Sequence, residues 1–238
     1  MMIPTAIQHQ FEFWKHIGQV GGYFHQYDGF SSLSPKDATW PSKIFDLKEH
    51  HIEALKQRIT NHHLSKFVAV EENEALEMLL RSKGFTQTSS VAAMTKKIDE
   101  KIQRSVYPEI EKVTDTLSTR TFAKIASAAF GYHIYESTIA PLISSAKVQL
   151  FLGKHENKYV SCGIVFVDAN GDSGLHMIGA KKEYRGLGLG KKMTQHLHSV
   201  ALRNESDYIH LVASKLGAPI YQKLGFQNQG YLKSYTIQ

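Results

Sequence analysis

Apolar residues recur along the chain with two spacings, one typical of helices and one typical of strands. Steps of three and four predict helices near residues 11–17, 49–63, 73–82 and 119–130, and a further helix after a glycine-rich loop within 185–203, with shorter ones at 139–143 and 218–223. Short apolar or alternating runs predict strands at 43–47, 66–70, 90–98, 148–152, 159–167, 174–180, 208–213 and 229–236. Residues 31–43 are polar with two prolines and predict a loop, and the charged stretch 99–111 predicts a linker. The mixture of helices and strands predicts an α/β fold.

Two parts of the sequence resemble each other at an offset of 141 residues. Residues 79–85 align with 220–226, Asn73 aligns with Ser214, and the final strands also correspond. Such self-similarity predicts two copies of one structural unit. With the linker as boundary, we expect a first half at 1–104, shortened and without early strands, and a second half at 105–238. Trp14, Trp40 and Phe45 are expected in the core of the first half.

Composition narrows the class of protein. The 238 residues are 42% hydrophobic and 21% charged, which is typical of a globular chain. No apolar run approaches the roughly 20 residues of a membrane span, and the start lacks a signal peptide, so a cytoplasmic protein without membrane contact is expected. The single cysteine, Cys162, excludes a disulfide framework and a multi-cysteine zinc site, and a packing role is expected for it. The histidine pairs 50–51 and 62–63 would diverge by about 100° on a helix, so we expect them to be solvated and expect no metal site.

A net charge of +6 attracts anions such as nucleic acid, a membrane or a phosphorylated small molecule, while an ordinary solvated surface is the alternative for most of the lysines. The basic residues are spread along the chain without a dense run or a recognition motif, so nucleic-acid binding is the weaker hypothesis. Two lysine pairs, 181–182 and 191–192, bracket a glycine-rich segment. This arrangement favours a small phosphorylated ligand.

The glycine-rich segment is Arg185-Gly186-Leu187-Gly188-Leu189-Gly190, between a predicted strand and a predicted helix. Glycines let the backbone N–H groups at a helix start approach and hold an anion. The run G-x-G-x-G lies late in the chain and differs from a dinucleotide fingerprint. Lys191 is followed by Lys192, where a P-loop requires Ser or Thr. A turn that only eases helix packing is the alternative interpretation.

The run Arg185-x-x-Gly188-x-Gly190 resembles the acyl-CoA-binding motif of the GNAT superfamily of N-acetyltransferases. The similarity extends to Tyr184 and to the segment 220–226, which resembles the family's closing signature, and it covers residues 110–238. It implies a mixed sheet splayed between its fourth and fifth strands, with acyl-CoA in the gap.

The resemblance also implies roles for individual residues. Backbone groups of Ile178 and Ala180 would bind the pantetheine arm. Arg185 belongs to the cofactor motif, and the pyrophosphate would lie against N–H groups of the segment that follows it: Gly186, Leu187, Gly188, Leu189, Gly190 and Lys191. Tyr221 stands where the family has its proton donor, and a free tyrosine remains protonated until a pH of about 10. Ser214 replaces the Asn usually found seven positions before it, which affects one hydrogen bond to pantetheine.

The general base and the acceptor pocket are less defined. Gly174 occupies the strand entry where the family often has a carboxylate, and His176 lies two residues on, where it points to the same face. His176 is therefore the candidate base, with packing as its alternative, and His210 and Glu183 are weaker candidates. An N–H group near Ile178 could stabilise the oxyanion. Acceptor contacts are expected between the first helices of the second half, at Tyr132, His133, Tyr135 and Glu136.

These observations predict an N-acetyltransferase that moves an acetyl group from acetyl-CoA directly to a primary amine of a small molecule or peptide. A CoA-binding regulatory pseudoenzyme is the alternative. In the first half, Leu80 aligns with Tyr221, and residues 45–49, which include Asp46 and Glu49, align with the glycine-rich segment. We therefore expect one molecule of CoA per chain and no metal.

Overall fold

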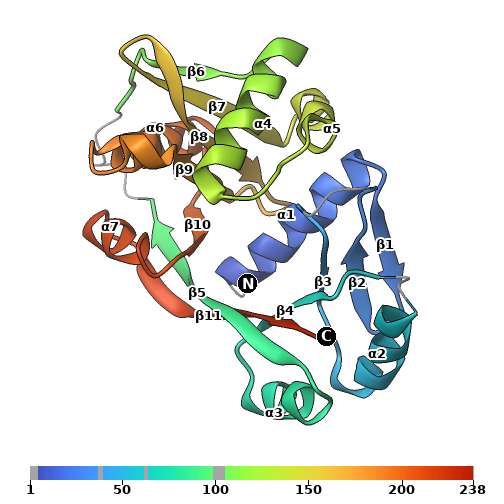
Figure 1. Cartoon of the computed structure of the whole chain (residues 1–238). Coiled ribbons are helices and arrows are strands. Elements are labelled where there is room, and N and C mark those ends of the chain that lie inside the picture. The colour runs from blue at the N-terminus through green and yellow to red at the C-terminus, as the bar shows by residue number, and fades with distance from the viewer. Residues whose placement is uncertain (1–4, 37–39, 62–63, 99–104, 238) are drawn as a thin grey trace. The chain divides into compact units, whose positions relative to one another are not determined.

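The computed structural model describes residues 5–36, 40–61, 64–98 and 105–237 (Figure 1). The chain divides into two compact units. The first unit combines residues 1–94 with the C-terminal segment 212–238, and the second contains residues 95–211.

The first unit is built on a sheet with strand order β1-β2-β3-β4-β11. Its elements are α1 (Ala6–Val20), β1 (Phe24–Tyr27), β2 (Phe30–Leu33), β3 (Lys43–Phe45), the 3-10 helix η1 (Glu49–His51), α2 (Ile52–Thr60), β4 (Phe67–Glu71), α3 (Glu74–Ser82), α7 (Ala218–Lys223) and β11 (Gln227–Thr236). Strands β3 and β4 are parallel, and the other neighbouring pairs of this series are antiparallel. Strand β5 (Thr86–Lys97) begins in this unit and ends in the second.

Helix α1 is longer than the spacing at residues 11–17 predicts, because its start is capped. The Thr5 side chain accepts a hydrogen bond from the Gln8 backbone N–H, and the Gln8 side chain accepts one from the Thr5 N–H. Trp14 and Phe45 are buried as expected, with ring centroids 5.5 Å apart, whereas Trp40 is only partly buried. A second group of buried residues packs α2 and α3 against the sheet. It includes Leu55 of α2 and Leu80 of α3.

The loop expected at residues 31–43 is wrong in part, because this segment contributes to two strands. Residues Phe30–Leu33 form β2, which pairs with β1 and β3 and is buried along its whole length. Its polar centre is compatible with burial because the Ser31 hydroxyl donates to the Gln26 side chain at 3.1 Å. The expectation that the first half lacks early strands is therefore wrong, because β1 and β2 precede β3.

One histidine pair was also misjudged. His51 is partly buried and its Nε2 lies 3.2 Å from an Asp28 carboxylate oxygen, so this residue is not simply solvated. A Cβ added to Gly29 would lie 2.1 Å from the His51 ring, which shows how closely the ring approaches that turn. His50 is exposed as expected, and the pair 62–63 lies outside the described residues.

The second unit has the strand order β10-β9-β8-β7-β6. Its elements are β6 (Ile110–Lys112), α4 (Thr116–Phe130), α5 (Glu136–Ile139), the 3-10 helix η2 (Ala140–Ser144), β7 (Val148–His155), β8 (Lys158–Val167), β9 (Ser173–Ala180), the 3-10 helix η3 (Lys182–Tyr184), α6 (Leu189–Arg203) and β10 (Tyr208–Ala213), whose last two residues belong to the first unit. The expected linker at 99–111 is wrong at its end, because Ile110–Lys112 pair with β7.

Both faces of β8 are covered by helices. Residues Val160–Phe166 are buried without alternation, which is typical of a strand enclosed on both sides. Helices α4 and α6 both pack on β8 and β9 (Figure 1). The four apolar positions predicted for one face of α6, Leu189, Met193, Leu197 and Val200, are all buried.

The internal repeat is visible in hydrogen bonds of the first unit, which contains both copies of the closing segment. Gly84 and Gly225 end α3 and α7 with φ of +90° and +88°. The next residue, Phe85 or Phe226, donates its N–H to the carbonyl of Leu80 or Tyr221, at 3.0 Å in both cases. These paired contacts, 141 residues apart, correspond to a Schellman-type helix end in each copy.

The final strand of each half lies beside a strand of the other half. In the first unit, β11 pairs with β4 over five residues, from Leu232↔Glu71 to Thr236↔Phe67. In the second unit, the C-terminal end of β5 lies beside the start of β10, where the N–H of Ile98 donates to the Asp207 carbonyl at 2.8 Å. The compact units therefore combine segments of both halves. The expected boundary at 104/105 adjoins residues outside the described ranges and remains a proposal about the two related halves.

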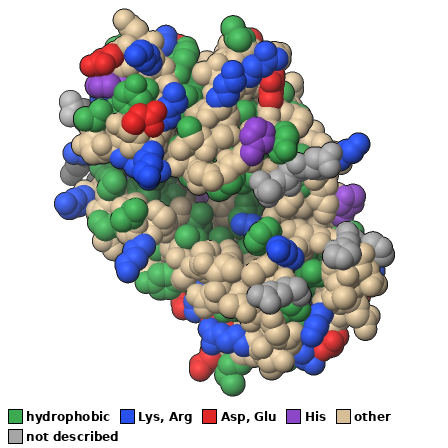
Figure 2. Space-filling view, in the orientation of Figure 1, with side chains coloured by type: hydrophobic (Ala, Val, Ile, Leu, Met, Phe, Trp, Pro, Cys, Tyr) green, Lys and Arg blue, Asp and Glu red, His purple; other side chains and the backbone are tan. Residues whose placement is uncertain are grey.

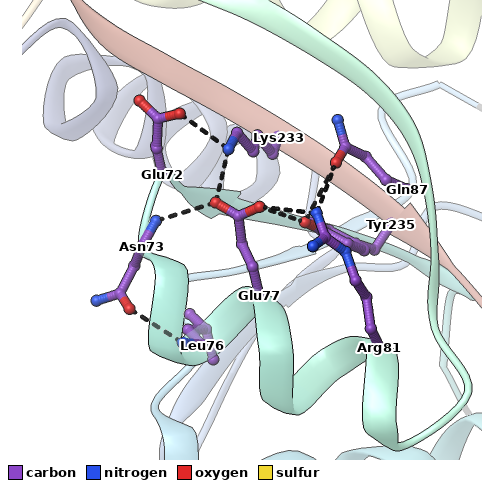
Figure 3. A network of polar contacts seen from close by, with 8 residues as sticks. All are labelled: Glu72, Asn73, Leu76, Glu77, Arg81, Gln87, Lys233 and Tyr235. Atoms are coloured by element: carbon purple, nitrogen blue, oxygen red, sulfur yellow. Dashed lines mark hydrogen bonds and ion pairs between the residues drawn. The ribbon is translucent and has the colours of Figure 1, made fainter.

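A buried carboxylate fixes β11 to α3 (Figure 3). Glu77 is 4% exposed, and its carboxylate accepts hydrogen bonds from Lys233 at 2.7 Å and from the Tyr235 hydroxyl at 2.8 Å. Lys233 also contacts Glu72 at 2.8 Å, and Arg81 contacts Glu77 at 3.2 Å. Burial by itself would raise the pKa of Glu77, but the hydrogen bonds from Lys233 and Tyr235 outweigh it and hold the pKa below its ordinary value.

Candidate functional site

The start of α6 presents backbone N–H groups that the helix itself does not use. Gly188 is the N-cap residue, with φ of +74° and no side-chain capping bond. Its carbonyl accepts the first helical bond, from the Lys192 N–H at 3.0 Å. By helix geometry, the N–H groups of Leu189, Gly190 and Lys191 point outward from the helix end, where the dipole favours an anion. This end can therefore hold a phosphate group.

The glycines of this segment leave open space beside the backbone. Cβ atoms added to Gly186, Gly188 or Gly190 would meet no protein atom within 4 Å. Gly186 and Gly188 have φ of +85° and +74°, so they also require glycine for the turn itself. Packing within the chain therefore does not explain Gly190, which supports close approach of a ligand.

The four lysines that bracket this segment have different surroundings. The Lys192 ammonium lies 2.6 Å from a Glu109 carboxylate oxygen and 5.4 Å from the centre of the Tyr107 ring, so it is already paired. Lys182 and Lys191 are exposed, and Lys181 is partly buried. On the face drawn in Figure 2, lysine and arginine side chains are scattered among other types. Lys191, at the start of α6, is the cation best placed beside the open N–H groups.

Arg185 has a structural contact within the second unit. Its guanidinium donates a hydrogen bond of 2.7 Å to the Ala129 carbonyl, in the last turn of α4. That carbonyl is one of the four that a helix leaves without an internal partner. The side chain of Arg185 thus connects the glycine-rich segment to the end of α4. This contact explains an arginine at position 185 without a direct bond from its guanidinium to phosphate.

Strand β9 departs from regular geometry at the positions expected to meet pantetheine. Its neighbour β10 is in register at Ser173↔Ile209 and Gly174↔His210, while β9 continues to Ala180. On the other side, Ile164 pairs with His176 and Cys162 with Gly179, so β9 has one extra residue opposite Gly163. Met177 has φ of +50° at this β-bulge. Ile178 and Ala180, both partly buried, follow it.

Cys162 contacts this bulge from β8. The thiol is fully buried, and its Sγ lies 3.4 Å from the Met177 carbonyl oxygen. Burial raises the pKa of Cys162 to about 12, although the Gly179 backbone N–H directed at the sulfur opposes the rise. The packing role expected for Cys162 agrees with this placement, and the thiol remains a protonated donor at neutral pH.

The candidate bases lie in different environments. His176 is 6% exposed, and its ring centroid lies 6.4 Å from that of Phe166. His210 is fully buried, its Nδ1 lies 2.8 Å from the Thr95 hydroxyl, and burial lowers its pKa to about 4. Glu183 is exposed on η3. The burial of His210 argues against proton exchange with solvent at that residue, and that of His176 favours its alternative packing role.

Two candidates belong to the first unit, and the structure describes each only within that unit. Tyr221 is on α7, partly buried, with its ring centroid 5.9 Å from that of Phe226. Ser214 is exposed, and its Oγ accepts a hydrogen bond of 3.2 Å from the Gly217 N–H. Asn73, its equivalent at the offset of 141, accepts from the Leu76 N–H at 3.0 Å in the same way. The side-chain oxygen of Ser214 therefore has a local role in starting α7.

The residues expected to contact the acceptor form an exposed aromatic segment after α4. Tyr132 and Tyr135 are 43% and 39% exposed, and the ring centroids of His133 and Tyr135 are 4.1 Å apart. Glu136 is paired with Arg120 at 2.9 Å. The segment offers aromatic faces and a paired carboxylate, which are compatible with an amine.

The structure also bears on metal binding, on membrane-spanning helices and on the first half of the chain. Among the residues that the structure describes, no group of three or more His, Cys, Asp or Glu is arranged to hold a metal ion. No helix within the described ranges is both long and apolar enough to cross a membrane. In the first half, Asp46 is exposed and pairs with Lys48 at 2.9 Å, and Leu80 is fully buried.

Sequence reasoning did not identify three contributors to this region: Met177, Glu109 and the Ala129 carbonyl. A left-handed backbone at a methionine has no signature in a single sequence, because the conformation comes from strand pairing. Glu109 and Ala129 contact their partners across 83 and 56 residues. The glycine at position 163, opposite the bulge, was the single local signal.

Comparison with known proteins agrees with this geometry. Residues 146–228 match the acetyltransferase (GNAT) domain family. An uncharacterised N-acetyltransferase of Bacillus subtilis, YitH, is 30% identical over 102 residues, which is 43% of this chain but only 29% of that protein. The chain therefore spans less than a third of this curated relative.

Two solved structures resemble a larger part of the chain. A GCN5-related N-acetyltransferase from Kribbella flavida superposes with a TM-score of 0.74, at 15% identity, over 100% of this chain and 96% of its own. A second, from Sphaerobacter thermophilus, gives a TM-score of 0.63 at 14% identity, over 87% and 76%. At these identities the likeness concerns the fold, and it extends through the first half. The chain thus has the fold of GNAT N-acetyltransferases, and its residues 146–228 match the GNAT acetyltransferase domain family.

Proposed function

We propose that this protein transfers an acetyl group from acetyl-CoA directly to a primary amine of a small molecule or peptide, in the cytoplasm and without a metal. The uncapped N-terminus of α6, with its glycines open to solvent, carries the proposal. It lies within the residues that match the GNAT domain. The pyrophosphate would lie against the N–H groups from Gly186 to Lys191, with Lys191 adding positive charge.

The backbone of β9 supports a second part of the cofactor site. Consecutive N–H groups of a strand point to opposite edges. Because the Lys181 N–H donates to the Val160 carbonyl of β8 and Gly179 pairs with Cys162, the N–H groups of Ile178 and Ala180 are directed toward the other edge. There they can bind the pantetheine amides and the thioester oxygen as it becomes an oxyanion.

Transfer within a ternary complex is supported by the state of the single cysteine. A thiol with a pKa near 12 in a fully buried position is a poor nucleophile, so an acyl-enzyme at Cys162 is not proposed. The neutral amine would attack the thioester carbon, the C–S bond would break, and Tyr221 would give its proton to the leaving sulfur. The attacking nitrogen would lose its extra proton to solvent, and solvent would return a proton to the Tyr221 oxygen. Burial of His176 favours deprotonation of the amine by solvent before attack.

One alternative has a specific observation in its favour. Gly174 stands at the strand entry where GNAT enzymes often have a carboxylate, and the side chain of His176 nearby is buried. Without an accessible general base, the chain could bind CoA without turnover, as a regulator. Calorimetric titration with acetyl-CoA followed by a thiol-release screen of small amines and peptide N-termini separates these functions. We expect one binding site per chain and CoA release with at least one amine class. Binding without turnover on the whole panel would favour the regulator, and no binding would refute both.

The same titration tests the first half. Asp46 and Glu49 lie where the second half has its glycines, and carboxylates there would repel a pyrophosphate. A second acetyl-CoA per chain that persists in a variant disabled at Gly190 would contradict the assignment of a single site.

A further inference from the structure

The bulge in β9 carries a strained residue that a hydrogen bond from another strand maintains. Met177 has φ of +50°, a region that residues other than glycine, asparagine and aspartate seldom occupy. Met177 and Ile178 together stand opposite Gly163, whereas Cys162 and Ile164 pair with Gly179 and His176. Such a conformation persists only where the surroundings enforce it, and it is frequent at functional sites.

The surroundings that enforce it include the Cys162 side chain. Its Sγ donates to the Met177 carbonyl at 3.4 Å, and Cys162 pairs with Gly179 across the two strands. Met177 and Gly179 flank Ile178. The thiol is fully buried, so water does not compete for its bond to the Met177 carbonyl.

Helix α4 also restrains the bulge, on the face of the sheet to which the Cys162 side chain points. A Cβ added to Gly179 would lie 2.9 Å from the Ala129 Cβ and 3.2 Å from the Phe130 ring, so α4 packs directly on this backbone. The rotation of the Met177–Ile178 and Ile178–Gly179 peptides is thus restricted from α4 and from β8. Of these restraints, the thiol is the one that acts by a directed hydrogen bond.

We propose that Cys162 is a positioning residue for acetyl transfer: by holding the Met177 carbonyl, it fixes the Met177–Ile178 peptide and aims the Ile178 N–H at the thioester oxygen. The inference rests on the proposed function and adds a specific role for a buried side chain. Cys162 itself touches neither substrate. Its removal should lower the rate of the chemical step more than the binding of either substrate, because misalignment of an oxyanion donor affects the transition state most.

The test compares Cys162→Ala, which removes the donor, with Cys162→Ser, which keeps a donor of similar size. Val165→Ala is the matched control, since Val165 is also fully buried on β8 but pairs with Leu175, away from the bulge. We expect Cys162→Ala to lower kcat by about 10-fold to 100-fold, with KM for the amine and the affinity for acetyl-CoA changed less than about threefold. Cys162→Ser should regain most of the rate, and Val165→Ala should lower the melting temperature while keeping kcat.

Two results would overturn the proposal: a kcat for Cys162→Ala equal to that of Val165→Ala, or a Ser variant as slow as the Ala variant. A readout without substrates separates this failure from that of the proposed function. In protein labelled with ¹⁵N-isoleucine, the Ile178 amide resonance should move in Cys162→Ala and stay near its wild-type position in Cys162→Ser and Val165→Ala. If the wild type acetylates no amine, the function fails, while an unmoved Ile178 resonance in Cys162→Ala rejects the positioning role by itself.

Discussion

Gly188 and Gly190 stand two residues apart at the start of α6, and only Gly188 needs glycine for its backbone. Gly188 has φ of +74°, whereas Gly190 has ordinary helical geometry, and a Cβ at either position would face open space. A substitution at Gly190 therefore tests whether a ligand needs the space beside the backbone, whereas a substitution at Gly188 would also strain the turn.

Gly190→Ala should abolish or strongly weaken binding of acetyl-CoA without harming the fold. Alanine in a helix is more favourable than glycine by about 1 kcal/mol, so the melting temperature should stay the same or rise. Binding should fall because the methyl group occupies the space that the phosphate needs. Calorimetry with acetyl-CoA and a thermal melt check both parts. Unchanged affinity in this variant would reject the anion site.

Gly171→Ala provides a control for strain. Gly171 has φ of +88° in the turn before β9 and also faces open space, but it lies outside the proposed cofactor site. This variant should lose about 1 kcal/mol of stability and keep its affinity for acetyl-CoA.

Tyr221→Phe should keep the affinity for acetyl-CoA and lower turnover by about 100-fold, the low end for loss of a general acid. The hydroxyl is the sole group removed, and the ring contact with Phe226 is retained. Steady-state kinetics at saturating substrates measure the effect, provided that chemistry limits the rate. Tyr231→Phe, at an exposed tyrosine of the same unit, should leave the rate unchanged. Equal rates for the two variants would leave Tyr221 a packing residue.

Arg185→Met should destabilise the end of α4 more than it weakens cofactor binding. The lost bond to the Ala129 carbonyl is partly buried, and we expect a cost of about 0.5–1.5 kcal/mol and faster hydrogen exchange at residues 127–131. Lys191→Met is the converse variant: the ammonium of Lys191 is exposed and forms no ion pair with the residues that the structure describes, so acetyl-CoA affinity should fall and stability should hold. The opposite pattern for the pair would show that the Arg185 guanidinium binds phosphate.

Glu77→Gln should lower the free energy of unfolding by about 1.5–3 kcal/mol, the usual range for buried hydrogen bonds to a charged group. Glu72→Gln is the matched control, since Glu72 contacts the same Lys233 from a side chain that is 45% exposed, and it should cost less than about 1 kcal/mol. Urea unfolding measures both.

The same carboxylate predicts a dependence of stability on pH. The folded pKa of Glu77 is lowered, so its contribution is fully present above the unfolded value of 4.5 and is lost as the pH falls through the folded pKa. Stability of the wild type should therefore fall more steeply below pH 4.5 than that of Glu77→Gln. Parallel curves for the two proteins would contradict this role for Glu77.

The sequence by itself determined the features that depend on neighbouring residues. The apolar face of α6, the helix ends at Gly84 and Gly225, and the glycine-rich segment before α6 all follow from spacing and from backbone preferences. The repeat at an offset of 141 residues was readable because each copy repeats the same local hydrogen bonds, and so keeps similar residues at the same spacing.

Strand partners were decided only in the tertiary structure. The four residues of β2 have too polar a pattern to predict a strand. They form one because they pair with β1 on one side and with β3 on the other. The pairing of β11 with β4, and the position of β5 along β10, join residues that lie far apart in the chain. A single sequence contains the preference for a strand but not the identity of its neighbour, because many partners satisfy the same alternation.

The candidate site divides in the same way. Local sequence determined the open N–H groups at the start of α6, since they need only glycines and a helix. The bulge at Met177, the thiol of Cys162 that holds it, and the bond from Arg185 to the end of α4 needed three separate segments to meet. Their energies come from contacts across the sheet and its covering helices. Such contacts exist only after the chain has packed, and so no local pattern encodes them.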